Sequence, residues 1–325
     1  MSSRIWLPTG FLVLALWGVI ARSVAAGPPA PLSPAAHPPA APGTFPPSWI
    51  AGVNCSTDPK IQMHAYNDDL WILRQSKCTH FESPFVFVIF GLEKVLVIDT
   101  GAPGDPGFGE AVSGLVESWS EKNGVTDLEL IVAHSHPHSD HIYGDPEFAG
   151  LVNTTVVGHS LSQVQSFFGF DPGQWPEQQV TYDLGGRTLD VLATPGHHPA
   201  SLTFYDSRTQ LLLTGDIVYP GHLFIFAQSQ WDDFKDSIER LLHFAGTNPV
   251  EWVLGCHIEW TSQPGGCLSW GTSAHPDERV LQMRPQVLKE IHDTAASMGN
   301  NPVCGNVQDD FVIHPVYVCG ITGGC

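Results

Sequence analysis

Basic side chains are scarce in this sequence. Its 325 residues include only 14 Lys and Arg against 33 Asp and Glu, which gives a formal net charge of −19. Such a surface repels the phosphate backbones of DNA and RNA, so nucleic acid is not expected as a partner. The charge does not exclude small anionic substrates, because bound metal ions can reverse the electrostatic potential inside a site.

Long apolar runs are also nearly absent. Residues 11–21 form a run of eleven residues, which is short for a membrane span of roughly 20 residues. The run follows Arg4 and precedes the small residues Val24, Ala25 and Ala26, a pattern typical of a secretory signal peptide. We therefore expect a signal peptide at residues 1–26, cleavage after Ala26, and a secreted or periplasmic protein without membrane contact after cleavage. An uncleaved anchor is the alternative.

Motifs for nucleotides and for structural zinc are missing too. The turn at residues 101–104 lacks the glycine spacing of dinucleotide and phosphate loops, and the seven cysteines include no C-x-x-C pair. Cysteines of an exported chain can form disulfides, and their order suggests Cys55–Cys78 and Cys304–Cys319. The odd number leaves at least one thiol free or paired with another chain.

The body of the chain has the composition of a folded domain. Hydrophobic residues make up 42% and charged residues 14%, which is enough apolar material for a sizeable core. Proline and alanine dominate residues 27–48, which we interpret as an extended linker. Residues 49–325 are expected to form a single domain with a C-terminal helix and a cysteine-containing tail.

Apolar patterning predicts both strands and helices along this domain. Strands are expected at residues 70–73, 84–90, 94–99, 128–133, 154–157, 188–193, 201–205, 210–213, 251–254 and 311–318. Helices are expected at residues 108–121, 231–244 and 276–297, the last interrupted by Pro285. Strands come first and then alternate with helices, an order that suits an α+β fold in which two sheets pack face to face with helices outside.

The most informative segment is His134-Ser135-His136-Pro137-His138-Ser139-Asp140-His141, directly after the apolar run at residues 128–133. Imidazole and carboxylate groups are ligands that suit zinc and similar metals. Three imidazoles and one carboxylate between residues 136 and 141 can reach only a small volume. The segment therefore predicts a metal site, and a surface polyhistidine tract is the alternative.

The segment resembles the H-x-H-x-D-H motif of the metallo-β-lactamase superfamily. Four further segments resemble other motifs of that family in the same order: Val97-Ile98-Asp99-Thr100-Gly101, Thr194-Pro195-Gly196-His197, Thr214-Gly215-Asp216 and Gly255-Cys256-His257. The resemblance covers roughly residues 65–260. It implies an αββα sandwich of two mixed sheets, with the site at one sheet edge.

The resemblance also implies a ligand set for two divalent ions. His136, His138 and His197 would hold the first ion, Asp140, His141 and His257 the second, and Asp216 would bridge them. We expect zinc, with iron and manganese as alternatives that accept the same ligands.

Other residues near the motifs receive roles by the same resemblance. Asp140 would also orient the nucleophile, and Asp99 would fix hydrogen bonds around the ligands. Tyr219 lies three residues after Asp216, where lactonases of the superfamily often place a tyrosine close to the substrate carbonyl; a simple wall residue is the alternative. His134, His198 and Cys256 are expected to be structural.

The predicted activity is hydrolysis of a small-molecule ester, lactone or related acyl bond by a metal-bridging hydroxide. Asp216 stands where zinc β-lactamases of the superfamily usually have Cys or Ser, so a dedicated antibiotic-degrading enzyme is not expected. Phosphoester and thioester hydrolysis are alternatives, although the tail from Ile258 holds few basic residues for glutathione. A non-catalytic extracellular metal-binding module is the alternative from another class. The oligomeric state does not follow from the sequence.

Overall fold

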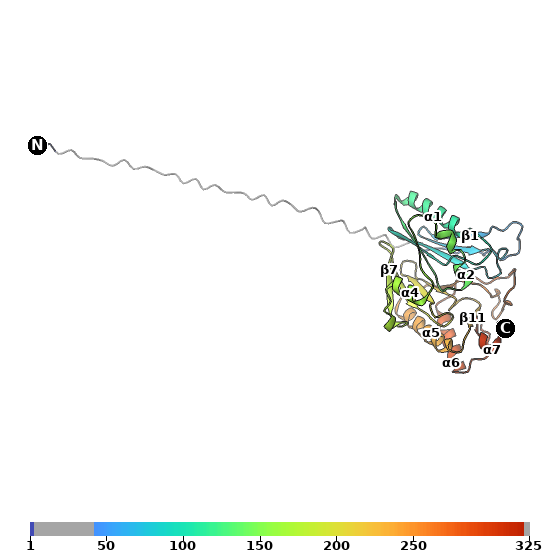
Figure 1. Cartoon of the computed structure of the whole chain (residues 1–325). Coiled ribbons are helices and arrows are strands. Elements are labelled where there is room, and N and C mark those ends of the chain that lie inside the picture. Colours follow the sequence, from blue (N-terminus) through green and yellow to red (C-terminus); the bar gives the residue numbers. More distant parts are fainter. Residues whose placement is uncertain (3–41, 322–325) are drawn as a thin grey trace. The chain divides into compact units, whose positions relative to one another are not determined.

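The computed structural model describes residues 1–2 and 42–321, and residues 42–321 belong to one compact unit (Figure 1). Its strands are β1 (Ile61–Asn67), β2 (Leu70–Gln75), β3 (Phe85–Phe90), β4 (Lys94–Ile98), β5 (Glu129–Ala133), β6 (Thr154–Val156), β7 (Gln179–Asp183), β8 (Thr188–Ala193), β9 (Leu202–Asp206), β10 (Leu211–Gly215), β11 (His222–Ile225), β12 (Trp252–Gly255) and β13 (Val312–Pro315). Its α-helices are α1 (Phe108–Asn123), α2 (Ser139–Ile142), α3 (Asp145–Phe148), α4 (Leu161–Phe168), α5 (Gln230–Thr247), α6 (Gln286–Met298) and α7 (Val316–Cys319).

Two mixed sheets form the centre of the fold. The first has the order β1-β2-β3-β4-β5-β6, antiparallel from β1 to β4 and parallel from β4 to β6. The second has the order β12-β10-β9-β8-β7 and is antiparallel except for the parallel pair β10 and β12. Strands β11 and β13 pair in parallel in a small third sheet.

Three hydrophobic clusters show that the layers are helix, sheet, sheet and helix. Every residue of β3 is buried, because its alternating side chains serve two of these clusters. Phe85, Phe87 and Ile89 lie in the cluster shared with the second sheet, whereas Val86, Val88 and Phe90 lie in the cluster shared with α1. A third cluster joins the outer face of the second sheet to α5 and α6. The predicted αββα sandwich is thus confirmed.

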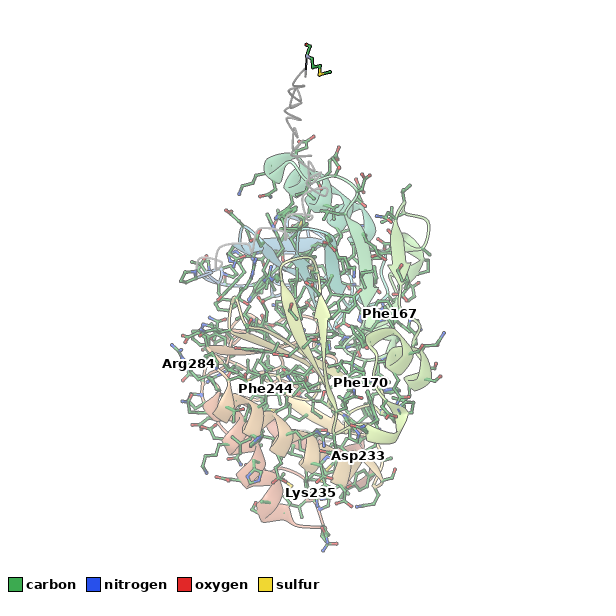
Figure 2. All side chains as sticks on the ribbon, turned by 90° about the vertical axis from the view of Figure 1, so that its left-hand side faces the viewer. Phe167, Phe170, Asp233, Lys235, Phe244 and Arg284 are labelled. Carbon is green, nitrogen blue, oxygen red and sulfur yellow. A yellow bond between two sulfur atoms is a disulfide. The ribbon has the colours of Figure 1, made fainter. Side chains whose placement is uncertain are left out.

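The helices cover the outside of this sandwich. In Figure 2, α5, with Asp233, Lys235 and Phe244, runs along the side of the molecule that faces away from α1. Phe167 of α4 and the following Phe170 pack at the edge of the central cluster.

Most predicted strands and the first two predicted helices are found within a few residues of their expected bounds. The helix expected from residue 276 is wrong in its first half, since α6 begins only at Gln286. Pro285 sits at its N-cap, and the preceding residues instead form short bridges such as Val253 with Met283. The strand expected at residues 311–318 also ends early, at Pro315, where α7 begins.

The disulfide predictions are confirmed among the described residues. Cys55 pairs with Cys78 and Cys304 with Cys319, and Cys256 is a buried free thiol. Disulfides persist in oxidising environments, so the two bridges indicate a non-reducing compartment. Within residues 1–2 and 42–321, no helix is long and apolar enough to cross a membrane.

The start of the folded unit differs from the expected linker boundary. The predicted signal peptide and most of the linker lie outside the described residues. The last part of the linker contacts the body: the Thr44 N–H donates to the Tyr66 carbonyl at 2.9 Å, and the Phe45 ring packs 5.1 Å from the Tyr66 ring.

Candidate metal centre

The predicted ligands all follow the carboxyl ends of strands. The motif with residues 136–141 follows β5, His197 follows β8, Asp216 follows β10 and His257 follows β12. Strand β8 is antiparallel to β9, and β9 to β10, so β8, β10 and β12 all end at the same edge of the second sheet. The loop after β5 meets that edge from the first sheet. The topology therefore brings together ligands that lie far apart in the sequence. His141 and His257, for example, are 116 residues apart.

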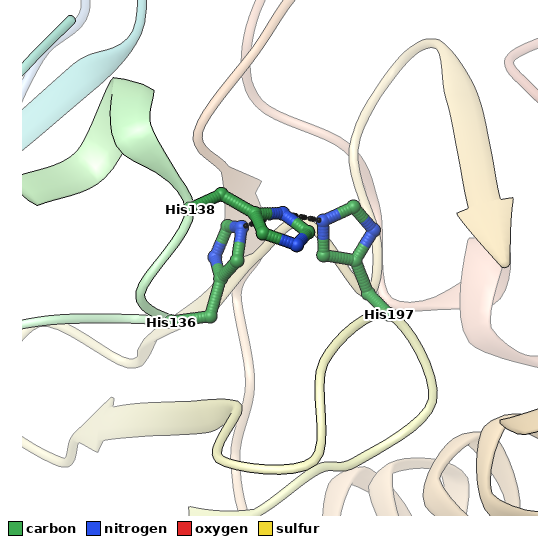
Figure 3. A group of neighbouring side chains, drawn as sticks. All are labelled: His136, His138 and His197. Atoms are coloured by element: carbon green, nitrogen blue, oxygen red, sulfur yellow. Dashed lines mark hydrogen bonds between the residues drawn. The ribbon is translucent and has the colours of Figure 1, made fainter. Parts of the chain in front are cut away.

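Three imidazoles form the first group of side chains (Figure 3). His138 Nδ1 lies 3.0 Å from His136 Nε2 and 2.9 Å from His197 Nε2. His197 Nδ1 lies 2.9 Å from the Phe224 carbonyl, which can only accept a hydrogen bond, so Nδ1 carries the proton and Nε2 offers a lone pair. Three ring nitrogens that converge on one point form an arrangement suited to a metal ion.

Two imidazoles and two carboxylates form the second group. Asp140 Oδ2 lies 3.1 Å from His141 Nε2 and 3.2 Å from His257 Nε2. The Nε2 atoms of His141 and His257 are 3.3 Å apart. His257 Nδ1 lies 3.0 Å from the Glu82 carbonyl, so the nitrogen that faces the group is again the one with the lone pair.

Asp216 lies between the two groups. Its Oδ2 is 3.4 Å from His257 Nε2 in the second group and 3.7 Å from His197 Nε2 in the first. Its Oδ1 is buried and has no hydrogen-bond partner. A buried carboxylate oxygen without a partner is costly unless a cation accompanies it.

The electrostatics of the groups also fit a cation. Burial, followed by the charge of His141, holds the pKa of His136 well below its usual value, so this ring stays neutral. Burial opposes ionisation of Asp216, but the charges of His257 and His141 outweigh it and hold the pKa of Asp216 well below its usual value. Burial disfavours the charged forms of His141 and His257, but the carboxylates of Asp140 and Asp216 outweigh it and raise the pKa of both rings well above the usual value. A divalent ion would displace these two protons, because only neutral imidazoles and ionised carboxylates bind metal. The donor set therefore fits two divalent ions.

Asp99 fixes the orientation of the second group, as expected. Its Oδ1 accepts from the Ser135 N–H at 2.7 Å, and its Oδ2 accepts from His141 Nδ1 at 2.8 Å. The Cys256 thiol lies 3.2 Å from Asp99 Oδ2, and burial and then the charge of Asp99 raise the pKa of this thiol well above its usual value. Cys256 is thus a buried, protonated thiol, in line with its expected structural role.

The two flanking histidines make hydrogen bonds outside the ligand groups, although the His198 ring packs 5.4 Å from the His138 ring. His134 Nε2 lies 2.9 Å from Asp145 Oδ1, and His198 Nδ1 accepts from the Ala200 N–H at 3.1 Å. Both contacts are local and agree with structural roles.

A cavity of about 70 Å3 opens onto the two groups. Tyr219 lines it, with its ring 5.6 Å from the His257 ring. The Tyr219 hydroxyl donates to the His222 carbonyl and lies 3.2 Å from Glu259 Oε2. Burial and the charge of Glu259 raise its pKa well above the usual value, so the hydroxyl stays protonated.

Six lining residues received no site role from the sequence: Glu82, Phe224, Phe226, Glu259, Trp270 and Ile321. Glu259 lies two residues after a ligand, and this proximity is the signal that could have found it. Glu82 precedes β3 and Trp270 lies in an irregular segment, so only the fold brings them to the cavity. A larger groove of about 660 Å3 lies between the β7–β8 hairpin and α5, and none of the predicted ligands lines it.

Comparison with known proteins agrees with the geometry. The sequence model of the metallo-beta-lactamase superfamily matches residues 81–245. An acyl-coenzyme A thioesterase, MBLAC2 of Homo sapiens, is 26% identical over 202 residues, which cover 53% of this chain and 72% of that protein. A hydroxyacylglutathione hydrolase of Bartonella quintana (strain Toulouse) is 28% identical over 130 residues, covering 39% of this chain and 47% of that protein. Among solved structures, a metallo-beta-lactamase from Pontibacter korlensis superposes with a TM-score of 0.47 at 14% identity, covering 73% of this chain and 99% of that chain.

Proposed function

Because the chain belongs to the metallo-beta-lactamase superfamily, we propose that it is a dinuclear metallohydrolase that cleaves an ester, lactone or related acyl bond of a small molecule. The observation that carries the proposal is the convergence of two ligand groups on either side of Asp216. Two divalent ions at such a site polarise a scissile carbonyl and lower the pKa of a water molecule that attacks it.

Each ligand has a stated part in this proposal. His136, His138 and His197 would hold one ion, Asp140, His141 and His257 would hold the other, and Asp216, which lies between the two groups, would contact both. Zinc is the first choice, since it favours imidazole and carboxylate ligands, and iron or manganese would accept the same set.

The remaining residues orient the reactants. Asp140 touches both imidazoles of its group, so its carboxylate can hold the attacking water in one direction. Tyr219 stays protonated and lines the cavity, which suits a hydrogen-bond donor near the substrate carbonyl. To serve there, its hydroxyl would have to leave the His222 carbonyl.

Thioesters are a specific second candidate among acyl bonds. Relatives of the chain are named as an acyl-coenzyme A thioesterase and as hydroxyacylglutathione hydrolases. A thioester has the same acyl carbonyl as an ester, so the same arrangement would serve both.

We also propose that the protein is exported, with a signal peptide at residues 1–26, a linker at 27–48 and a single domain at 49–325. The two disulfides support a non-reducing location. N-terminal sequencing of protein from the extracellular or periplasmic fraction should begin at Gly27; protein that keeps Met1 would contradict the cleavage.

The experiment that tests the activity is hydrolysis by the chain from Gly27 of an aryl ester, a lactone, a thioester, an aryl phosphate and a cephalosporin, each with and without a chelator. Chelator-sensitive turnover of an acyl substrate supports the proposal, and Asp216→Ala should lower both metal content and rate. Turnover of the aryl phosphate alone would show that the enzyme cleaves phosphoester bonds and not acyl bonds. Folded protein that binds metal but turns over no substrate would favour the non-catalytic binding module.

A further inference from the structure

The wall of the cavity beyond the predicted ligands is acidic and aromatic. It includes the carboxylates of Glu82 and Glu259 and the rings of Phe224, Phe226 and Trp270. Within the part of the chain that the structure describes, no Lys or Arg lines this cavity. The wall is therefore unsuited to an anionic substrate group.

The carboxylates of Glu82 and Glu259 differ in their hydrogen-bond and ion-pair partners. Glu259 Oε2 accepts from the His222 N–H at 3.2 Å and lies 3.1 Å from His222 Nδ1, so its charge is already partnered. Glu82 has a weaker partner, His80 Nδ1 at 3.3 Å from its Oε2, and its side chain is 22% exposed. The ammonium of Lys77 does not line the cavity and donates to the Phe81 carbonyl at 2.7 Å. Glu82 is thus a carboxylate that can still receive a cation from the cavity.

Aromatic rings stand on the same wall. The Trp270 ring packs 5.1 Å from the ring of Phe81, the residue before Glu82, which brings indole and carboxylate to one part of the cavity. The Phe226 ring lies 5.3 Å from each of the rings of His138 and His197, next to the first ligand group. The faces of such rings attract organic cations, and tryptophan does so most strongly.

The charge of the cavity wall points in the same direction. Four carboxyl groups line the cavity, namely Glu82, Asp140, Asp216 and Glu259, and no basic side chain of the described residues lies among them. The net charge of the chain, −19, further favours the approach of cations over anions.

We propose that the substrate carries an ammonium group, held by the Glu82 carboxylate and the ring of Trp270 while its acyl carbonyl faces the metal ligands. This inference rests on the proposed acyl hydrolysis and narrows it to cationic esters, lactones or thioesters. A substrate whose acyl group is attached to a part rich in phosphate or carboxylate groups would be repelled by the Glu82 carboxylate.

The test compares two thioesters that differ in one atom. Acetylthiocholine carries a trimethylammonium group, and 3,3-dimethylbutyl thioacetate has carbon in place of that nitrogen. We expect kcat/KM to favour the cationic thioester by about tenfold. Glu82→Gln should bring this ratio close to one, and Trp270→Leu should lower it. Glu110→Gln removes the same charge from an exposed position on α1 and should keep the ratio.

A binding measurement separates this inference from the proposed activity. Phenyltrimethylammonium, which cannot be hydrolysed, is titrated calorimetrically into the metal-loaded protein. We expect binding that weakens about tenfold in Glu82→Gln and is unchanged in Glu110→Gln. Failure of both thioesters to turn over would count against the acyl hydrolase only, since this titration still reports on the cation site. Equal binding by wild type and Glu82→Gln, or a preference for the neutral thioester, would overturn the inference.

Discussion

Asp99 shows how one residue can control a metal ligand without facing the metal. Its backbone has a positive φ of 71°, and its two oxygens accept from the Ser135 N–H and from His141 Nδ1. By keeping the proton on Nδ1, Asp99 keeps the lone pair on the Nε2 atom that faces Asp140 and Asp216.

Asp99→Asn keeps the shape of this side chain but can turn an N–H group toward His141 Nδ1. We expect the ring to change tautomer and the affinity of the second group for metal to fall about 10- to 100-fold, measured by competition with a chromogenic chelator. Asp190→Asn, a partly exposed position on β8, is the matched control and should keep the affinity. Unchanged affinity in Asp99→Asn would show that Asp99 does not set the tautomer.

At the scale of the elements, the loop that carries His197 depends on its close approach to α5. Gly196 has a φ of 141°, and a Cβ at this position would come within 2.6 Å of the Cα of Phe234. Only glycine fits such an approach to helix backbone. The loop after β8 is therefore held against α5, and this contact fixes the position of the His197 backbone.

Gly196→Ala should push this loop away from α5. We expect a loss of more than about 1 kcal/mol in the free energy of unfolding, measured by urea denaturation, together with weaker metal binding. Gly114→Ala is the matched control, because Gly114 is exposed on α1 and a Cβ there meets nothing within 4 Å. That control should stabilise the protein by about 0.5–1 kcal/mol. If both variants behaved alike, the close approach at Gly196 would have no role.

The elements also show how far the sequence alone could lead. Apolar runs such as residues 94–98 and the dense histidine motif after β5 are local signals, so the central strands and the position of the two ligand groups were predictable. The segment 276–284 was not, because its pairing partners, such as Val253 for Met283, lie elsewhere in the chain. Glu82 reaches the cavity only because the turn before β3 lies beside His257, a contact without a local pattern.

At the scale of the whole molecule, a buried arginine that is paired with an aspartate joins the two sheets. Arg187, in the turn between β7 and β8, donates to Asp206 Oδ2 at 2.5 Å and to the carbonyls of Asp69 and Phe90 at 2.7 and 3.0 Å. Both charged side chains are fully buried. Burial opposes ionisation of Asp206, but Arg187 outweighs it and holds the pKa of Asp206 below its usual value.

This pair should make the fold sensitive to acid. A depressed pKa stabilises the protein above the usual aspartate pKa of about 3.9, and that contribution is lost as the pH falls through the lower folded value. Asp206→Asn leaves Arg187 unpaired and should cost about 3–5 kcal/mol at pH 7, measured by urea denaturation. The difference from wild type should shrink as the pH falls below about 4. A difference that stays constant to pH 3 would show that Asp206 is not ionised in the fold.

The central claim is that the chain holds two metal ions at the edge where strands of both sheets end. The measurement that tests it most directly is the metal content of the folded protein after equilibration with excess zinc and removal of loosely bound ions. We expect two ions per chain, and fewer in Asp216→Ala, since Asp216 lies between the two ligand groups. If both the wild type and Asp216→Ala held two ions per chain, Asp216 would not bridge the ions. A wild-type protein that keeps one ion or none would contradict the dinuclear centre itself.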